Sequence, residues 1–177
     1  MQPVTEHLIL VNERDEQVGI CEKMQAHRDN LLHRAFSVFL FNKKGEMLLQ
    51  QRASGKYHSG GLWTNTCCSH PRPGEDTLPA AQRRLQEEMG MTCALHEVFQ
   101  FTYQARLEDD LYEHELDHVF LGRTDETPQP DSQEVQAWRY ITKSQLRSEL
   151  LIHPEKFTVW FRQCINQVWD ACERFQD

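Results

Sequence analysis

The stretch that decides the fold is Thr77-Leu78-Pro79-Ala80-Ala81-Gln82-Arg83-Arg84-Leu85-Gln86-Glu87-Glu88-Met89, followed by Gly90. Its apolar residues recur at spacings of three and four, which predicts an amphipathic helix with one buried face. Asp76 or Thr77 is a suitable N-cap, and Gly90 suits the position just past the last turn. The second half of this helix is crowded with arginines and glutamates, so its exposed face is also a candidate for chemistry.

The residues before this helix are Trp63-Thr64-Asn65-Thr66-Cys67-Cys68-Ser69-His70-Pro71. They place a thiol two residues from an imidazole, and the acid-rich helix follows at once. Thiols, imidazoles and carboxylates so close together indicate a catalytic site built around a metal ion. The segment alone would also allow a structural zinc site, so the rest of the chain has to decide between the two.

Composition limits the class of protein. The 177 residues carry a net charge of −8, which disfavours nucleic acid as a partner because its phosphates would meet like charge. We find no signal-peptide pattern and no apolar run near the roughly 20 residues that a membrane span needs. The six cysteines are expected to be reduced, since a chain of this size does not need disulfides. We therefore expect one cytoplasmic domain over residues 1–177, with no membrane partner.

The rest of the chain alternates strand and helix signals. We expect strands near residues 7–11, 18–21, 36–41, 47–52, 98–107, 112–122 and 135–142. The strands at 36–41 and 47–52 are expected to form a hairpin. Residues 24–32 form a loop or a short helical turn, residues 54–61 form a loop, and residues 157–172 form a terminal helix. This order predicts an α+β fold, with a mixed sheet packed between helices, an N-terminal strand extension and C-terminal helices.

The strongest candidate metal ligands are His27, His33 and His70, with Glu113 and Glu115. The two glutamates alternate along a predicted strand, so their side chains project to one face. Three imidazoles and two carboxylates supply five ligands, which suits an octahedral divalent ion. A single histidine is by itself more often a surface or core residue, and the glutamate pair also fits a solvated sheet face. Six further histidines have no assigned role: His7, His58, His96, His114, His118 and His153.

The segment Ser69-x5-Glu75-x7-Arg83-Arg84-Leu85-Gln86-Glu87-Glu88-Met89-Gly90-Met91 resembles the Nudix box. That motif reads Gly-x5-Glu-x7-Arg-Glu-U-x-Glu-Glu-x-Gly-U, where U is a bulky aliphatic residue. Ser69 replaces the first glycine, and Arg84 replaces a glutamate that binds metal in the hydrolases. The change at Arg84 implies weaker hydrolysis with a retained diphosphate site, because arginine pairs well with phosphate oxygens. Apart from the resemblance, Arg84 and Glu88 would form an i,i+4 ion pair on an exposed helix.

Together with the Trp-Thr-Asn-x-x-Cys-x-His-Pro segment and the Glu-x-Glu strand, this helix resembles the type I isopentenyl-diphosphate isomerases. The resemblance extends from about His7 to Trp160 and implies a Nudix-like fold. The implied reaction converts isopentenyl diphosphate into dimethylallyl diphosphate. Because Cys68-Ser69-His70-Pro71 matches the family's Cys-Gly-His-Pro, the resemblance assigns the reactive thiol to Cys68 and makes Cys67 a bystander.

The same resemblance implies a role for each matching residue. The catalytic residues are Cys68, Glu115 and Tyr103. The substrate-binding residues are Lys23, Arg52, Lys56, Arg84 and Trp160. The ligands of a manganese or zinc ion are His27, His33, His70, Glu113 and Glu115, and Glu88 would bind Mg²⁺ carried with the diphosphate. The sequence does not distinguish which of Cys68 and Glu115 donates the first proton.

Two other functions remain open from sequence. One is a Nudix hydrolase of another diphosphate, which would not need the Cys68–His70 pair. The other is a non-catalytic metal-binding module, which would not need Glu88 or the basic residues. In the isomerase interpretation the partner is a small-molecule diphosphate, and we expect a monomer or weak dimer.

Overall fold

The computed structural model describes residues 5–175, which form one nine-stranded mixed sheet and four α-helices. The strands are β1 (His7–Val11), β2 (Gln17–Glu22), β3 (His33–Phe41), β4 (Met47–Arg52), β5 (Trp63–Thr64), β6 (Cys67–Ser69), β7 (His96–Arg106), β8 (Tyr112–Arg123) and β9 (Val135–Ile141). The helices are α1 (Lys23–Arg28), α2 (Thr77–Met89), α3 (Lys143–Ile152) and α4 (Val159–Arg174). Short 3₁₀ turns lie at Glu108–Asp110 and Pro154–Lys156. The predicted α+β class is confirmed.

Strand β3 is the centre of the sheet. It runs parallel to β8 along its whole length, from the pair His33–Glu115 to the pair Phe41–Arg123. On its other edge it pairs with β6, which is antiparallel to it. Because nearly every residue of β3 is buried, it reads as an apolar run, as central strands covered on both faces do.

The predicted hairpin of residues 36–52 is wrong beyond its turn. Strands β3 and β4 pair only at Phe41 and Met47, and β4 then diverges to pair with β9 and β5. The apolar faces of β3 are satisfied by other strands, so local sequence order does not decide its partners. The two strands diverge directly after the turn that joins them. Strand β6 occupies the position beside β3 that β4 would occupy in a regular hairpin.

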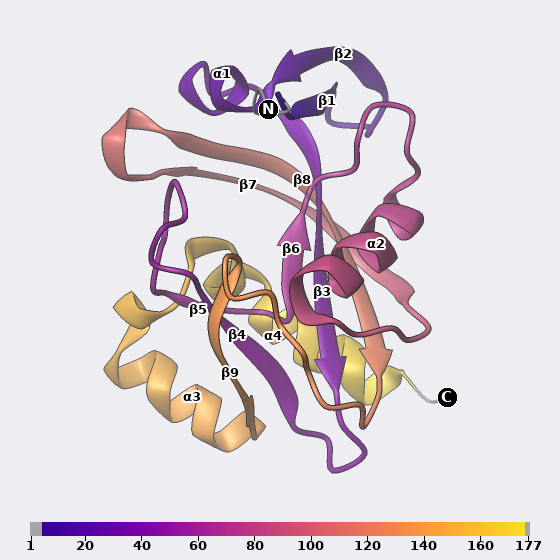
Figure 1. The fold of residues 1–177 in the computed structure, drawn as a ribbon, viewed down its shortest axis with the longest axis vertical. Coiled ribbons are helices and arrows are strands. Elements are labelled where there is room, and N and C mark those ends of the chain that lie inside the picture. Colours follow the sequence, from indigo (N-terminus) through magenta and orange to yellow (C-terminus); the bar gives the residue numbers. More distant parts are fainter. Residues whose placement is uncertain (1–4, 176–177) are drawn as a thin grey trace.

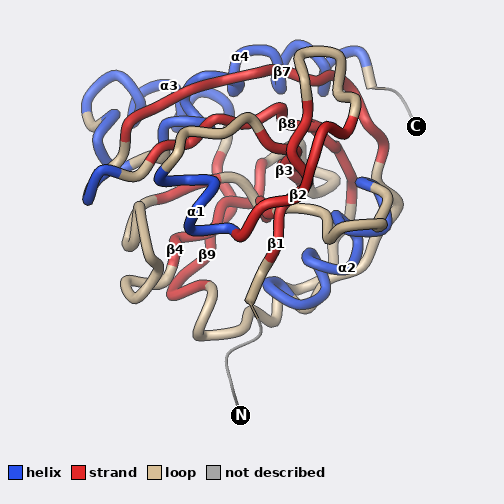
Figure 2. The backbone as a smooth tube through the Cα atoms, turned by 90° about the horizontal axis from the view of Figure 1, so that it is seen from above, coloured by secondary structure: helices blue, strands red, loops and turns tan. Residues whose placement is uncertain are grey.

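Helices cover both faces of the sheet, as predicted. Figure 2 shows α3 and α4 on one side of the strands and α2 on the other. Side chains of β3 alternate between the two cores. Phe36, Val38 and Leu40 pack with α2, whereas Phe39 and Phe41 pack with α4. Strands β1 and β2 extend the sheet at the start of β3, and α1 lies beside them against β8 (Figure 1).

Other local predictions had mixed outcomes. The helix predicted from residues 77 to 89 is α2, and Gly90 ends it with a left-handed backbone at φ 63°. Residues 24–32, expected to form a loop or a short helical turn, contain most of α1. Glu22 caps this helix, because its side chain accepts hydrogen bonds from the backbone N–H groups of Met24 and Gln25. Strands β5 and β6 are not predicted from the sequence, and α3 is covered only by the general expectation of C-terminal helices. Strands of two and three residues carry too little periodicity to be recognised.

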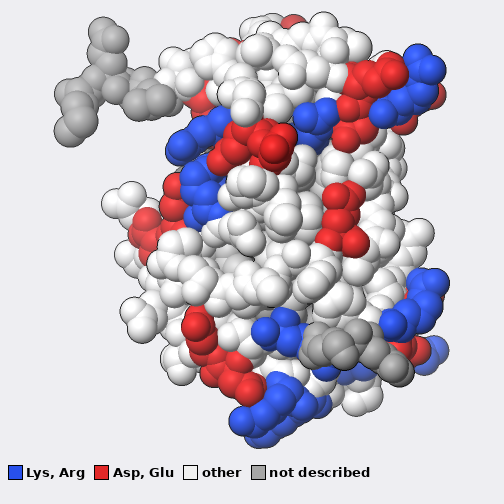
Figure 3. Space-filling model, turned by 90° about the vertical axis from the view of Figure 1, so that its right-hand side faces the viewer, with Lys and Arg blue, Asp and Glu red and all other residues white. Residues whose placement is uncertain are grey.

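Charges are mixed on the face drawn in Figure 3, where basic and acidic side chains lie beside one another. Among residues 5–175, no helix has the length and apolar character needed to cross a membrane.

Gly90, at the end of α2, lies so close to the loop that precedes β9 that a side chain there should destabilise the fold. A Cβ at this position would lie 2.5 Å from the carbonyl oxygen of Gln129, and the residue has positive φ. Gly90→Ala should therefore lower the free energy of unfolding by roughly 3 kcal/mol, from the backbone and the clash together. Gly45 also has positive φ but has no atom within 4 Å of such a Cβ, so Gly45→Ala should cost about 1 kcal/mol. Urea unfolding of both variants measures the difference, and equal losses would contradict the clash.

Candidate active site

A cavity of about 570 Å³ lies where β3 and β4 diverge, and it is bordered by α2 and by the N-terminal segment. It contains most of the residues singled out from the sequence. Those that line it are Cys68, Glu115, Tyr103, Lys23, Arg52, Lys56, Arg84, Trp160, His70, Glu113 and Glu88. His27 and His33 are fully buried and lie behind the lining residues. The structure therefore brings all of the predicted site residues into one region.

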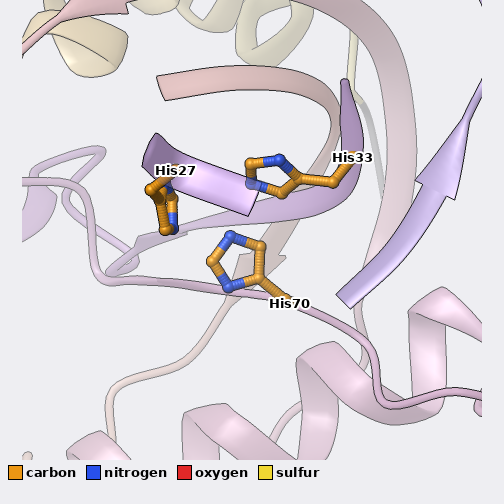
Figure 4. Close-up of side chains that lie close together, drawn as sticks. All are labelled: His27, His33 and His70. Atoms are coloured by element: carbon orange, nitrogen blue, oxygen red, sulfur yellow. The ribbon is translucent and has the colours of Figure 1, made fainter. Parts of the chain in front are cut away.

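Three imidazoles converge from separate elements, as Figure 4 shows. His27 lies on α1, His33 begins β3, and His70 follows β6. The ring of His33 lies 5.0 Å from that of His27 and 5.1 Å from that of His70, measured between centroids. This convergence follows from the sheet, because β6 and β3 are paired and α1 packs against β8.

Backbone contacts fix which nitrogen of two rings is available. His27 Nδ1 donates to the carbonyl oxygen of Tyr112 at 2.8 Å, and His33 Nδ1 donates to that of Leu31 at 2.8 Å. In the neutral form, each ring then has its lone pair on Nε2, which is the tautomer that binds metal through that atom. Burial, together with His70 and His33, lowers the pKa of His27 to about 4, so this ring is neutral at neutral pH.

The two glutamates lie directly beside the imidazoles. Glu113 and Glu115 alternate on β8 and are both buried, which confirms that they share a face. Glu115 accepts from His70 Nε2 at 2.9 Å and from the hydroxyl of Tyr103 at 2.5 Å. Tyr103 reaches it because the two residues are directly paired between β7 and β8.

The charges of these carboxyls differ. Burial and the neighbouring Glu115 raise the pKa of Glu113 well above its ordinary value. Burial opposes ionisation of Glu115 too, but His33 and His70 outweigh it and lower its pKa well below the usual range.

Several buried atoms in this region have no protein partner. Among the described residues, nothing forms a hydrogen bond with His33 Nε2, His70 Nδ1 or Glu113 Oε2. Buried polar atoms are normally satisfied, so three polar atoms without a partner in one cluster need an explanation. Two overlapping groups could each hold a metal ion, His27–His33–His70 and His33–Glu113–Glu115. Within each group the potential ligand atoms all lie within 4.8 Å of one another. A divalent cation fits this donor set and would satisfy the orphaned atoms.

The two adjacent cysteines face opposite sides of the sheet. Cys67 is fully buried in the core under α2, whereas Cys68 packs toward the α4 side and lines the cavity. Burial raises the pKa of the Cys68 thiol, although the Arg52 guanidinium acts in the opposite direction. At neutral pH Cys68 is therefore a protonated thiol within the cavity.

The basic residues of the cavity already have partners. Lys23 donates to Glu6 at 2.8 Å, and Lys56 is paired with Glu134. Arg84 donates to Glu88 at 2.7 Å and to Glu134 at 3.2 Å. The Arg84–Glu88 ion pair considered from the sequence is therefore present. It is not exposed, however, since 19% and 6% of the two side chains are accessible.

Trp160 and Arg52 form one wall of the cavity. The guanidinium carbon of Arg52 lies 5.4 Å from the centre of the Trp160 ring, at a distance suited to a cation–π contact. The indole N–H of Trp160 donates to Asn65 Oδ1 at 3.3 Å, which fixes the plane of the ring. An aromatic face is thus held at the cavity in one orientation.

Two further polar residues of this cavity, His58 and Glu134, have no role assigned from the sequence. His58 lines the cavity, and its Nε2 lies 2.7 Å from Glu113 Oε1. Glu134 joins Lys56 to Arg84 through an ion pair with each. Both residues lie in irregular segments, where no periodicity indicates which way a side chain points. The indication in the sequence that His58 belongs to the site is its position close to Lys56, which is a predicted substrate-binding residue.

Comparison with known proteins gives the same picture. The NUDIX domain family model matches residues 31–161. An isopentenyl-diphosphate Delta-isomerase of Pectobacterium atrosepticum is 48% identical over 174 residues, which cover 98% of this chain and 97% of that protein. One of Burkholderia multivorans is 54% identical over 162 residues, with 92% of each chain covered.

A solved structure from Deinococcus radiodurans has a TM-score of 0.71 and covers 84% of this chain and 90% of its own, at 22% identity. This likeness concerns the fold alone. The assignment rests on the family model, which matches residues 31–161, and on the two relatives, which match nearly the whole length of the chain. The chain belongs to the Nudix family and, within it, to the family of isopentenyl-diphosphate isomerases.

Proposed function

We propose that this protein converts isopentenyl diphosphate into dimethylallyl diphosphate, a step of isoprenoid biosynthesis. The observation that carries the proposal is the cavity, in which a protonated thiol and a fixed carboxylate accompany a basic, phosphate-suited region. The relatives' names support the same reaction. A hydrolase is less well supported, because hydrolysis needs neither Cys68 nor its placement beside an aromatic wall.

The chemistry requires one proton donor and one proton acceptor. A proton added to the terminal alkene carbon forms a tertiary carbocation, and loss of a proton from the neighbouring carbon completes the shift of the double bond. Cys68 and Glu115 reach the cavity from different strands, and we assign them these two roles. Tyr103 holds the Glu115 carboxyl in place, and the ring face of Trp160 would stabilise the cation by roughly 0.5 to 2 kcal/mol.

The metal sites belong to the proposal. His27, His33, His70, Glu113 and Glu115 would hold one divalent ion, and their imidazoles favour Mn²⁺ or Zn²⁺. Glu88 would bind Mg²⁺ that arrives with the diphosphate. When bound, these ions supply positive charge that favours ionised Glu115 and offsets the charge of the phosphates.

The diphosphate would occupy the basic end of the cavity. Lys23, Arg52, Lys56 and Arg84 supply the charge there, and each is held by a neighbouring side chain or backbone oxygen. Charge-assisted contacts to phosphate would hold the substrate by its unreactive end and place its carbons near Cys68 and Glu115.

Compartment and assembly are also part of the proposal. Each of the six cysteines, all of which lie within residues 5–175, is free. Free thiols are typical of reducing compartments, which supports a cytoplasmic enzyme. We propose that it works as a monomer or weak dimer on a small-molecule substrate, without nucleic acid or membrane.

Purified protein incubated with isopentenyl diphosphate and Mg²⁺ should form dimethylallyl diphosphate, detected by product analysis. Cys68→Ala should lower kcat by about 10²- to 10⁴-fold, because it removes a proton carrier. Cys67→Ala is the matched control and should stay close to wild type, since Cys67 faces the α2 core. Loss of activity in Cys67→Ala with activity retained in Cys68→Ala would contradict the assignment.

Removing ligands should remove the bound metal. His27→Ala, His70→Ala and Glu113→Gln each delete one proposed donor, so elemental analysis of the purified variants should find the ion lost or strongly depleted. His153→Ala serves as the control, because His153 is paired with Glu155 at the surface. Full occupancy in all three ligand variants would contradict the five-ligand assignment.

Arg84→Glu tests how the site chooses between isomerisation and hydrolysis. An anion in place of the guanidinium should raise the KM for isopentenyl diphosphate by on the order of tenfold to a hundredfold. It should not create an efficient hydrolase, because the substrate carbons, not its phosphorus atoms, are placed at Cys68 and Glu115.

The assay for this variant measures both dimethylallyl product and released phosphate. Arg84→Gln separates the loss of a cation from the gain of an anion next to Glu88 and Glu134, and circular dichroism checks that both variants fold. An unchanged KM in both would show that Arg84 only holds its carboxylate partners.

A further inference from the structure

His58 is a buried imidazole of the cavity that the proposed chemistry does not use. It lies in the loop between β4 and β5, and only 5% of it is accessible. Its Nε2 lies 2.7 Å from Glu113 Oε1, and its Nδ1 lies 3.1 Å from the hydroxyl of Ser59. When Glu113 is ionised, as a metal ligand must be, its carboxylate can only accept, and the Ser59 hydroxyl can donate to Nδ1, so Nε2 carries the proton that faces Glu113.

The loop that carries His58 has little freedom. A Cβ on Gly60 would lie 2.6 Å from the carbonyl oxygen of Ser54, so the loop closes tightly on itself. Gly61 N–H donates to the carbonyl oxygen of Arg52 at 3.0 Å, and an N–H of the Arg52 guanidinium donates to that of His58 at 3.1 Å. The ring is therefore presented to Glu113 by a fixed backbone.

The contact with His58 gives the two carboxyl oxygens of Glu113 different surroundings. Oε1 is engaged by His58, whereas Oε2 is buried and has no hydrogen-bond partner in the described part of the chain. Oε2 also lies on the side of the imidazole cluster, 3.9 Å from His27 Nδ1. A carboxylate held in this way offers one defined oxygen to a cation.

We infer that His58 is a positioning residue, which holds Oε1 of Glu113 and thereby presents Oε2 as the metal ligand. Hydrogen-bond partners behind metal ligands fix ligand orientation and commonly change metal affinity by 10- to 100-fold when removed. His58 also packs edge-on against Trp160, with the ring centroids 6.0 Å apart. It therefore connects the metal cluster to the aromatic wall of the cavity.

This inference rests on the metal site proposed above, but not on the reaction. Its main rival is that His58 is itself a ligand. The groups whose ligand atoms lie close enough to share an ion do not include His58, and direct ligation would require Nε2 to leave Glu113. Substitutions can separate the two roles, because the amide nitrogen of glutamine donates a hydrogen bond as imidazole does but has no lone pair with which to bind a metal ion.

The experiment titrates metal-free protein with Mn²⁺ and follows binding by calorimetry and electron paramagnetic resonance. His58→Phe keeps the ring shape but removes the donor, and it should weaken Mn²⁺ binding by about 10- to 100-fold. His58→Gln restores a donor near the position of Nε2 and should bind within a few-fold of wild type. His153→Phe is the matched control at an exposed histidine and should bind as wild type does.

Each result bears on a different claim. Wild-type affinity in His58→Phe would overturn the inference. Equal weakening in His58→Phe and His58→Gln would also overturn it, and would make His58 a direct ligand. Absence of Mn²⁺ binding by wild type would instead contradict the proposed metal site. If circular dichroism shows that the phenyl ring prevents folding, His58→Met, which also lacks a donor, replaces that variant.

Discussion

The parallel pairing of β3 with β8 is the constraint on which the site depends. It places His33 directly opposite Glu115, and the neighbouring pairing of β8 with β7 places Tyr103 beside the same carboxyl. Side chains alternate along a strand, so a shift of β8 by one residue would turn both glutamates away from the imidazoles. The apolar side chains of the two cores oppose such a shift, because the same alternation sorts β3 between α2 and α4. Packing of the core and assembly of the site are therefore set by one register.

Local patterns predicted the parts of this architecture that depend on neighbouring residues. The bounds of α2 were predicted because apolar spacing, an N-terminal cap position and Gly90 all lie within one short stretch. The shared face of Glu113 and Glu115 follows from strand alternation alone. The motif around Cys68 supplied the remaining candidates by resemblance, and the cavity brings them together. That these residues would meet was predictable, whereas the way they meet was not.

The missed features depend on contacts between distant segments. The divergence of β3 from β4 arises because β6 and β8 satisfy the edges of β3, and no local signal reports such competition. His58 becomes part of the site only because a closed loop turns it toward β8. Glu134 acts as a bridge only because the loop before β9 passes between Lys56 and Arg84. Each of these residues has an ordinary sequence context, so its role is a property of the fold.

The pairing of the cavity's cations with carboxylates has a consequence for turnover. Lys23 and Lys56 are each held by a carboxylate, from Glu6 and Glu134, before any anion binds. Capture of a diphosphate is therefore an exchange of one anionic partner for another, which yields less net affinity than a bare positive pocket would. In the proposed reaction, substrate and product carry the same diphosphate. Stronger binding of the diphosphate would therefore stabilise both complexes equally and would not speed the chemical step. In that reaction the resident carboxylates would therefore favour release of the product, because they lower the affinity of the cavity for any diphosphate.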